Sequence, residues 1–397
     1  MAQPLTANTT ANTEDTRAPG FDDAVIGSSP MMVMHAIRLA RAGRRVCLLE
    51  RTGDLGGNWQ LATLSSGDQV EIACHLIEVF PGIYDLLEEY SGVPFVDLDV
   101  QPIRVTRRGL KVTYFSRGLM LASGARLIVG WIKAHLDLLR GTAPDRDRVL
   151  NFRNKLASYL KYQLPVFFGT SVMKGPRDGF ADFMLQLCAR AREAGVMFTR
   201  MEVAALTLAS DGLWEIAGVA GDQVAVRHVH VTTSTNLERV APGRVVAGPK
   251  RDVHRMSVVV DVPREEVQVS HTYVAFWADP QIARIARIDN PGPARPALRF
   301  LVEFHKPDLD AQGDWCAAIR ERMEHAGIVG PGARLDIAGQ VDCTYTANVD
   351  QFPPGRLDHN LWGYYSTGNL AAGLAAWRGS DPTMPEASQT KTGYMKA

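Results

Sequence analysis

The feature that most constrains the fold lies between residues 23 and 50, where a strand, a helix and a second strand follow one another. Asp23–Ile26 is a short apolar run that ends at Gly27, helix-forming residues occupy 31–43, and 45–50 is apolar except at its ends. A strand without polar alternation is typical of a parallel strand buried on both faces. Strand, helix and strand within about thirty residues predict the βαβ unit of a dinucleotide-binding fold.

The turn inside this unit carries the first candidate binding residues: Gly27, Ser28 and Ser29. In dinucleotide folds the backbone N–H groups at the helix N-terminus bind a pyrophosphate, and an acid at the end of the second strand binds ribose hydroxyls. Glu50 stands in the position of that acid. Only the first glycine of G-x-G-x-x-G is present, with Ser29 and Met32 at the other two positions. By itself the turn is therefore also compatible with a βαβ unit that binds no cofactor.

The residues after Glu50 add a second motif. The segment 48–59 (LLERTGDLGGNW) resembles the ribose-binding acid and adjoining glycine pair of FAD-dependent enzymes in the amine oxidase, protoporphyrinogen oxidase and UDP-galactopyranose mutase superfamily. In that family the acid holds the adenosine ribose, and the glycine pair lets the backbone pass close to the FAD phosphates. The resemblance implies that FAD is the cofactor. The residues it assigns to cofactor binding here are Glu50, Arg51, Gly56, Gly57, Asn58 and Trp59.

Two internal segments resemble the same family in the same order. Residues 69–78 (QVEIACHLIE) look like the stretch that runs to the flavin face, and the resemblance makes His75 a candidate catalytic residue. Residues 175–206 look like the turn, helix and strand that return to the nucleotide domain, which implies that Val203 contacts adenine through its backbone.

The closing motif of the family resembles 363–373 (GYYSTGNLAAG), a strand, a glycine with a polar residue, and a helix aimed at the flavin. The resemblance assigns Gly368, Asn369 and Leu370 to cofactor binding, with Asn369 where the family usually has Asp. Tyr365 flanks the proposed flavin and is the second candidate catalytic residue. An aromatic residue at a strand end is also common in cores, so a purely structural role stays open.

These segments predict an α/β fold in which a discontinuous Rossmann-like FAD-binding domain carries a second, mixed α+β substrate domain. Single cores seldom grow past roughly 300 residues, so a chain of 397 is expected to form two lobes. The expected division is a flexible tail at 1–20, an FAD-binding domain from 21–75, 165–245 and 340–380, a substrate or cap domain from 76–164 and 246–339, and a C-terminal tail at 381–397.

Charge balance and apolar segments indicate which classes of partner to expect. The 43 basic and 43 acidic side chains balance, whereas a nucleic-acid binder usually has a basic excess. The first twenty residues lack the basic start and apolar stretch of a secretory signal. The most apolar segment, 119–139, is interrupted by charged side chains, so we expect an amphipathic helix packed on the protein and no integral membrane segment. We expect a cytoplasmic protein with a small-molecule substrate, and a homo-oligomer or a protein partner is compatible with the sequence.

Metal and anion sites receive little support. The five cysteines are scattered without zinc-ligand spacing, which favours a reducing compartment and no metal site. His228 and His230 alternate on one strand, but two ligands without a third partner are weak grounds for a metal, and we interpret them as structural. A basic run, Arg104, Arg107, Arg108 and Lys111, would suit an anionic substrate, although a solvated loop is the simpler interpretation.

Three functions follow from the resemblance. The leading one is an FAD-dependent oxidoreductase that oxidises or desaturates a small or medium-sized organic metabolite by hydride transfer to flavin N5. The second is a redox-neutral flavoenzyme of the sugar-mutase type, which works through reduced FAD. Because Ser29 and Met32 replace two glycines, the third is a scaffold or partner subunit that has lost tight FAD binding and catalysis.

Overall fold

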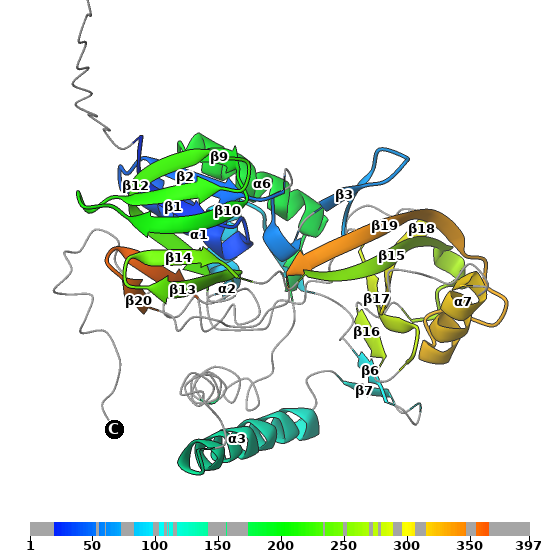
Figure 1. The fold of residues 1–397 in the computed structure, drawn as a ribbon. Coiled ribbons are helices and arrows are strands. Elements are labelled where there is room, and N and C mark those ends of the chain that lie inside the picture. The colour runs from blue at the N-terminus through cyan, green and yellow to red at the C-terminus, as the bar shows by residue number, and fades with distance from the viewer. Residues whose placement is uncertain are drawn as a thin grey trace, which may run out of the picture.

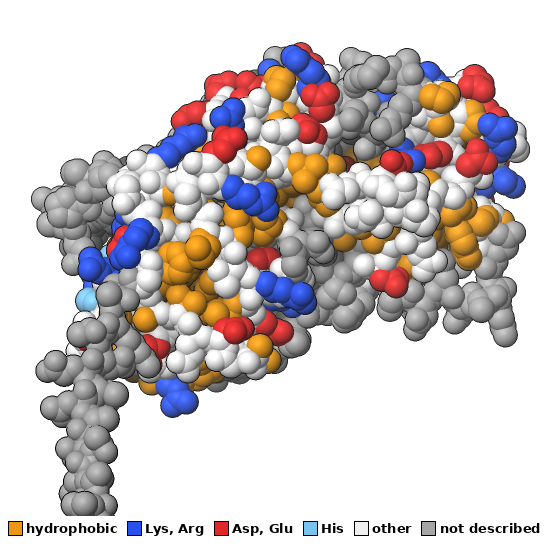
Figure 2. Space-filling view, turned by 90° about the horizontal axis from the view of Figure 1, so that it is seen from above, with side chains coloured by type: hydrophobic (Ala, Val, Ile, Leu, Met, Phe, Trp, Pro, Cys, Tyr) orange, Lys and Arg blue, Asp and Glu red, His pale blue; other side chains and the backbone are white. Residues whose placement is uncertain are grey.

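A computed structural model gives the fold of the chain. The structure describes residues 20–52, 55–59, 61–72, 83–97, 103–106, 109, 111–113, 117–141, 156, 174–232, 235–248, 252–269, 273–276, 279–288, 296–305, 315–346 and 355–364. Figure 1 shows two lobes, each built around its own β-sheet. The charged side chains on the face seen in Figure 2 are mixed, with basic and acidic groups side by side over the described residues.

The first lobe holds a large mixed sheet of ten strands, counted over the described ranges. Its strands, in the order in which they pair, are β13 (Leu237–Ala241), β14 (Arg244–Ala247), β10 (Val203–Leu208), β11 (Trp214–Gly218), β12 (Gln223–Thr232), β1 (Phe21–Ile26), β2 (Val46–Glu50) and β9 (Met197–Arg200), with β21 (Leu361–Tyr364) paired to β12 and to β20 (Gly355–Asp358). Within this sheet β9, β2, β1, β12 and β21 are parallel neighbours in that order. The carboxyl ends of these parallel strands therefore meet at one edge.

The βαβ unit predicted at the start of the chain is confirmed. Helix α1 (Pro30–Arg41) connects β1 to the parallel strand β2, whose five residues are all buried. Pro30 occupies the first turn, where a missing N–H costs nothing. The chain leaves the helix through Gly43, whose φ of 81° is one that glycine adopts readily.

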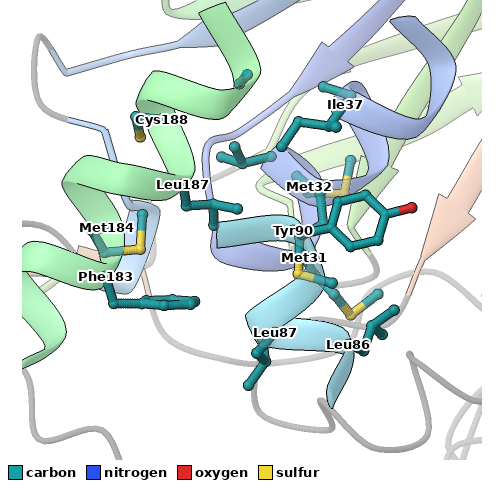
Figure 3. Close-up of a cluster of buried hydrophobic side chains, with 14 of the residues drawn as sticks. Met31, Met32, Ile37, Leu86, Leu87, Tyr90, Phe183, Met184, Leu187 and Cys188 are labelled. Atoms are coloured by element: carbon teal, nitrogen blue, oxygen red, sulfur yellow. The ribbon is translucent and has the colours of Figure 1, made fainter. Parts of the chain in front are cut away.

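Three helices share one buried cluster with residues of β1 and β2: α1, which lies on these strands, α6 (Gly179–Glu193), which packs on α1, and α2 (Ile83–Ser91), which packs on α6. Figure 3 shows Met31 and Met32 of α1 beside Leu87 of α2 and Leu187 of α6 in one buried cluster. Each fully buried apolar side chain of this size contributes about 1.5–3 kcal/mol. The packing therefore fixes the position of the N-terminus of α1 at the sheet edge.

The second lobe is a sheet of seven described strands with helix α7 (Trp315–Ala326) on one face. In pairing order they are β19 (Asp336–Thr346), β15 (Asp252–Pro263), β18 (Ala297–Phe304), β17 (Ile282–Arg287), β16 (Tyr273–Phe276), β6 (Ile103–Val105) and β7 (Lys111–Thr113). Short 3₁₀ turns lie at η1 (Gly57–Trp59) and η3 (Arg264–Glu266). The expected domain boundary at 340 falls within β19, and the domain division remains a prediction.

Two separate two-stranded sheets complete the described strands, one a local hairpin and the other a pairing of distant segments. Strands β3 (Leu61–Thr63) and β4 (Gln69–Glu71) form one pair, and β5 (Phe95–Asp97) pairs with β8 (Lys174–Pro176). Residues 175–179 were expected as a turn, but their first part is this strand, because β5 supplies a pairing partner about eighty residues away. A proline is tolerated in β8 because β5 is its one neighbour in the two-stranded sheet.

Helix α3 (Arg117–Leu139) confirms the helix expected at 119–139, but no buried apolar face is seen among its described side chains. Leu121, Val129 and Leu139 on this helix are exposed, so these side chains do not take part in the expected packing on the protein. None of the helices in the described ranges combines the length and apolar character needed to cross a membrane.

Candidate functional site

The candidate site lies at the carboxyl edge of β1 and β2, where three segments meet. The Gly27 N–H donates to the Leu49 carbonyl at 2.8 Å, which sets the turn after β1 beside the end of β2. The Met201 N–H donates to the Glu50 carbonyl at 2.8 Å, so the residues leading to Val203 reach the same edge. Residues assigned from distant parts of the sequence are thus brought together.

The Ser28 hydroxyl is the centre of the site. It donates to Glu50 Oε2 at 2.6 Å and accepts from the Gly56 N–H at 2.8 Å and the Gly57 N–H at 3.1 Å. A serine hydroxyl has one donor and two acceptor positions, and all three are used. The Ser28 N–H also donates to Glu50 Oε2, at 2.9 Å. Ser28 therefore joins the turn, the acid and the glycine pair.

Glu50 is buried at the end of β2, and its two oxygens differ. Oε2 takes both bonds from Ser28, whereas Oε1 faces Thr52, with the N–H at 3.3 Å and the hydroxyl at 3.4 Å. Hydrogen bonds at that length are weak. Oε1 is thus the oxygen best suited to accept from an external donor such as a ribose hydroxyl.

The approach of Gly57 to the helix N-terminus tests whether a dinucleotide fits. A Cβ at Gly57 would lie 3.1 Å from the backbone nitrogen of Ser29, and the φ of Gly57 is 58°. Only glycine permits this close approach without strain. The Ser29 hydroxyl at the N-cap of α1 is buried and has no hydrogen-bond partner among the described residues. An orphaned donor beside the unpaired N–H groups of a helix N-terminus fits a phosphate.

Two assigned residues have roles in the core. Met32, at the third glycine position, is fully buried between α1, α2 and α6. The Trp59 ring packs edge-on against Phe180 of α6, with centroids 5.5 Å apart. Both side chains hold the helix and the glycine segment in place.

The remaining assigned residues are covered in part. His75, Tyr365, Gly368, Asn369 and Leu370 lie outside the described residues, and Asn58 is described through its backbone alone. Arg51 directly follows β2, and Val203 begins β10. Of the basic run at 104–111, Lys111 is exposed.

A buried cluster of polar side chains joins α1 to strands β1, β12 and β21, and it was not anticipated from the sequence. His230 Nε2 lies 2.8 Å from Asp23 Oδ1, and His230 Nδ1 lies 3.1 Å from His35 Nε2 and 3.2 Å from the Tyr364 hydroxyl. Arg44 Nε is 2.5 Å from Asp23 Oδ2. His230 is thus structural, as interpreted, and is oriented by Asp23. His35 and Tyr364 stand in apolar runs that give no sequence signal of this contact.

Burial sets the protonation of the cluster. It lowers the pKa of His35 well below 6.5, with smaller contributions from the charges of His230, Arg38 and Arg44. Burial likewise raises the pKa of Tyr364. On the neighbouring position of β12, burial and then Arg44 lower the pKa of His228 to about 4. His35 and His228 are therefore neutral near pH 7. Among the described side chains no group of three or more His, Cys, Asp or Glu is placed to hold a metal ion.

Comparison with models of known protein families gives no match, and neither does comparison with curated protein sequences. Solved structures share the fold. An oxidoreductase from Methanosarcina mazei matches over 90% of this chain and 100% of its own, at 14% identity and a TM-score of 0.56. Cyclohexylamine oxidase from Brevibacterium oxydans IH-35A matches over 90% of this chain and 98% of its own, at 13% identity and a TM-score of 0.57. A triple mutant of putrescine oxidase, redesigned in its cofactor binding, matches over 89% of this chain and 94% of its own, at 13% identity and a TM-score of 0.55.

Proposed function

We propose that this chain is an FAD-dependent oxidoreductase that acts on a small or medium-sized organic metabolite. The observation that carries the proposal is the junction of Ser28, Glu50 and the Gly56–Gly57 pair at the N-terminus of α1. The fold shared with two amine oxidases and with an oxidoreductase supports the same class.

The roles follow from the chemistry of each group. Glu50 Oε1 would accept from the adenosine ribose, because its present contacts with Thr52 are long. The pyrophosphate would lie against the first N–H groups of α1 and the Ser29 hydroxyl, where the helix dipole favours negative charge. Because Gly57 has no side chain, the backbone at this position would be able to lie close to the pyrophosphate. Bound FAD would supply the hydride acceptor, and the protein would supply orientation and electrostatics.

The second lobe supports a substrate role by its position. The turn η1, which begins at Gly57, contacts β19 of the second sheet, and β4 contacts both α6 and that sheet. A substrate held between the lobes would then lie beside the cofactor. Pockets at domain junctions are a common place for small-molecule sites.

The direct test is the FAD content of a Glu50→Gln variant, with Asp22→Asn as the matched control. Asp22 pairs with Arg45 on the surface and takes no part in the site. The proposal predicts that Glu50→Gln weakens FAD binding at least about tenfold, which is a loss of about 1.4 kcal/mol, whereas Asp22→Asn leaves FAD binding unchanged. Equal FAD content in both variants would contradict the assignment of Glu50.

A further inference from the structure

Helix α3 exposes an unusual number of apolar side chains. Six of the twelve large apolar side chains that are exposed in the described part of the chain lie on it: Leu121, Ile128, Val129, Ile132, Leu136 and Leu139. None of the described helices or strands packs along α3, and Figure 1 shows it apart from both sheets. Exposed apolar surface that is gathered in one place marks an interaction site.

These side chains form one stripe along the helix. An α-helix turns by about 100° per residue, so residues that follow one another by three, four or seven positions lie in a row. Leu121, Ile128, Ile132 and Leu139 have this spacing, and the other two border the row on one side. Ala134, which is almost opposite to Ile132, is only 4% exposed. The helix is thus covered on one side, and its open side is an apolar stripe about 27 Å long.

Basic side chains line one edge of this stripe. Lys133 and Arg140 are seven residues apart, lie on the same side of the helix and are both exposed. Neither forms an ion pair with another described residue. Arg126 lies one step of seven residues earlier in the same row, and Asp137, the single acid between 117 and 139, lies beyond that row as seen from the stripe. The edge of the stripe is therefore basic.

An apolar stripe with a basic edge suits the surface of an anionic membrane. The apolar side chains would enter the boundary between headgroups and acyl chains, and the long side chains of Lys133 and Arg140 would reach anionic headgroups from the edge. At the other edge the Trp131 and His135 rings pack on each other, with centroids 5.1 Å apart. Tryptophan is enriched at the level of the headgroups. Because one side of α3 is covered, the helix would lie flat with the stripe toward the lipid.

A second copy of the chain suits the stripe less well. Helices that pair through apolar stripes often carry charges of both signs along the edges, which then form salt bridges. Here one edge has Lys133 and Arg140 and the other has Trp131 and His135, so neither edge carries an acid. Two α3 helices packed stripe to stripe would leave the basic side chains without acidic partners.

We propose that the exposed stripe of α3 binds the surface of a membrane that contains anionic lipids. The contact is peripheral, since only one side of the helix is open. It does not depend on the bound cofactor, so its test is independent of the FAD-dependent function proposed above.

Vesicle flotation of the purified full chain tests the contact. Vesicles of phosphatidylcholine alone are compared with vesicles of phosphatidylcholine and phosphatidylserine in equal amounts, and protein that merely aggregates does not float. Binding to the mixed vesicles is expected to be at least about tenfold tighter, and to weaken as salt screens the basic edge. Absence of flotation with the mixed vesicles, or equal flotation with both kinds, would overturn the proposal.

A matched pair of double variants assigns the binding to the stripe. Val129→Gln with Ile132→Gln is expected to weaken binding to the mixed vesicles at least about tenfold. The control is Val219→Gln with Val240→Gln, which changes two valines of the first lobe that are 64% and 54% exposed, and it should bind as the wild type does. Glutamine is a good helix former, and circular dichroism checks that α3 is kept. Equal binding by the two double variants would contradict the assignment to α3.

A third double variant tests the basic edge. Lys133→Gln with Arg140→Gln should reduce binding to the mixed vesicles toward the level seen with phosphatidylcholine alone, because the apolar stripe is kept. An unchanged preference for the mixed vesicles would refute the role of this edge. Sedimentation velocity without lipid examines the other occupant. A dimer that Val129→Gln with Ile132→Gln dissociates, in a wild type that does not float, would show that a second copy covers the stripe and would overturn the proposal.

Discussion

The Ser28 hydroxyl donates to Glu50 Oε2 at 2.6 Å, and this bond ties the turn after β1 to the end of β2. The Ser28 Oγ also accepts from the consecutive N–H groups of Gly56 and Gly57. The serine that follows the first glycine therefore organises the candidate site without any ligand.

Ser28→Ala should lower the free energy of unfolding by about 1–3 kcal/mol, because the buried N–H groups of Gly56 and Gly57 lose their acceptor. Ser29→Ala is the control, since that hydroxyl has no partner among the described residues, and its change should stay within about 0.5 kcal/mol. Urea unfolding of the FAD-free proteins measures both. Equal losses in the two variants would refute the role assigned to Ser28.

Gly57→Ala should destabilise the protein more than Gly67→Ala. Both glycines have positive φ, for which an L-residue costs about 1–2 kcal/mol. A Cβ at Gly57 would also meet the Ser29 backbone at 3.1 Å, whereas one at Gly67 meets nothing within 4 Å. Thermal unfolding and FAD retention of the two variants measure the difference. If Gly67→Ala lost as much stability and as much FAD, the close approach at Ser29 would have no consequence.

Asp23→Asn should cost about 3 kcal/mol, at the low end for a broken buried pair because Arg44 is partly exposed. The adjacent Asp22 pairs with Arg45 at 3.3 Å on the surface, so Asp22→Asn should cost about 0–1 kcal/mol. Denaturant unfolding near neutral pH compares the two. Similar costs would mean that the Asp23, His230 and Arg44 contacts contribute little.

His35 makes stability depend on pH. Its pKa is lowered in the folded state, so below pH 6.5 the unfolded chain binds a proton that the folded chain does not, and stability falls as the pH falls. The His35→Leu variant lacks this pH-dependent contribution to stability, and its His230 Nδ1 keeps the contact with the Tyr364 hydroxyl at 3.2 Å.

The free energy of unfolding of His35→Leu, relative to that of the wild type, should therefore rise as the pH drops, with a slope that approaches about 1.4 kcal/mol per pH unit. Urea unfolding of both proteins at several pH values on either side of 6.5 measures the difference. A difference that stays constant across that range would show that His35 does not titrate as described.

The sequence predicts the first lobe well where local pattern decides. Asp23–Ile26, Val46–Glu50 and the helix between them carry the periodicity, the turn residues and the acid, and all three form as predicted. Gly56 and Gly57 were also identifiable, because a glycine pair at that distance from the acid is a recognisable motif. Both have positive φ, a backbone conformation that glycine adopts readily.

Contacts between distant segments could not be predicted. His35 and His230 are 195 residues apart, and nothing in the sequence around either histidine indicates this contact. Arg255 and Arg284 both contact Glu303 in the second sheet, and this grouping depends on strand register, which a shift of one residue would reverse. The sequence also does not specify that Gly57 packs against Ser29 at the start of α1, or that the Ser29 hydroxyl is buried there without a hydrogen-bond partner among the described residues.

The most direct test of the central claim is the absorbance spectrum of the purified protein before and after denaturation, with chromatography of any released nucleotide. The proposed function predicts flavin absorbance and release of FAD, or uptake of FAD by protein purified without it. A colourless protein that stays empty when FAD is added would contradict the account. In that case the junction of Ser28 and Glu50 would be a structural contact of a non-catalytic scaffold.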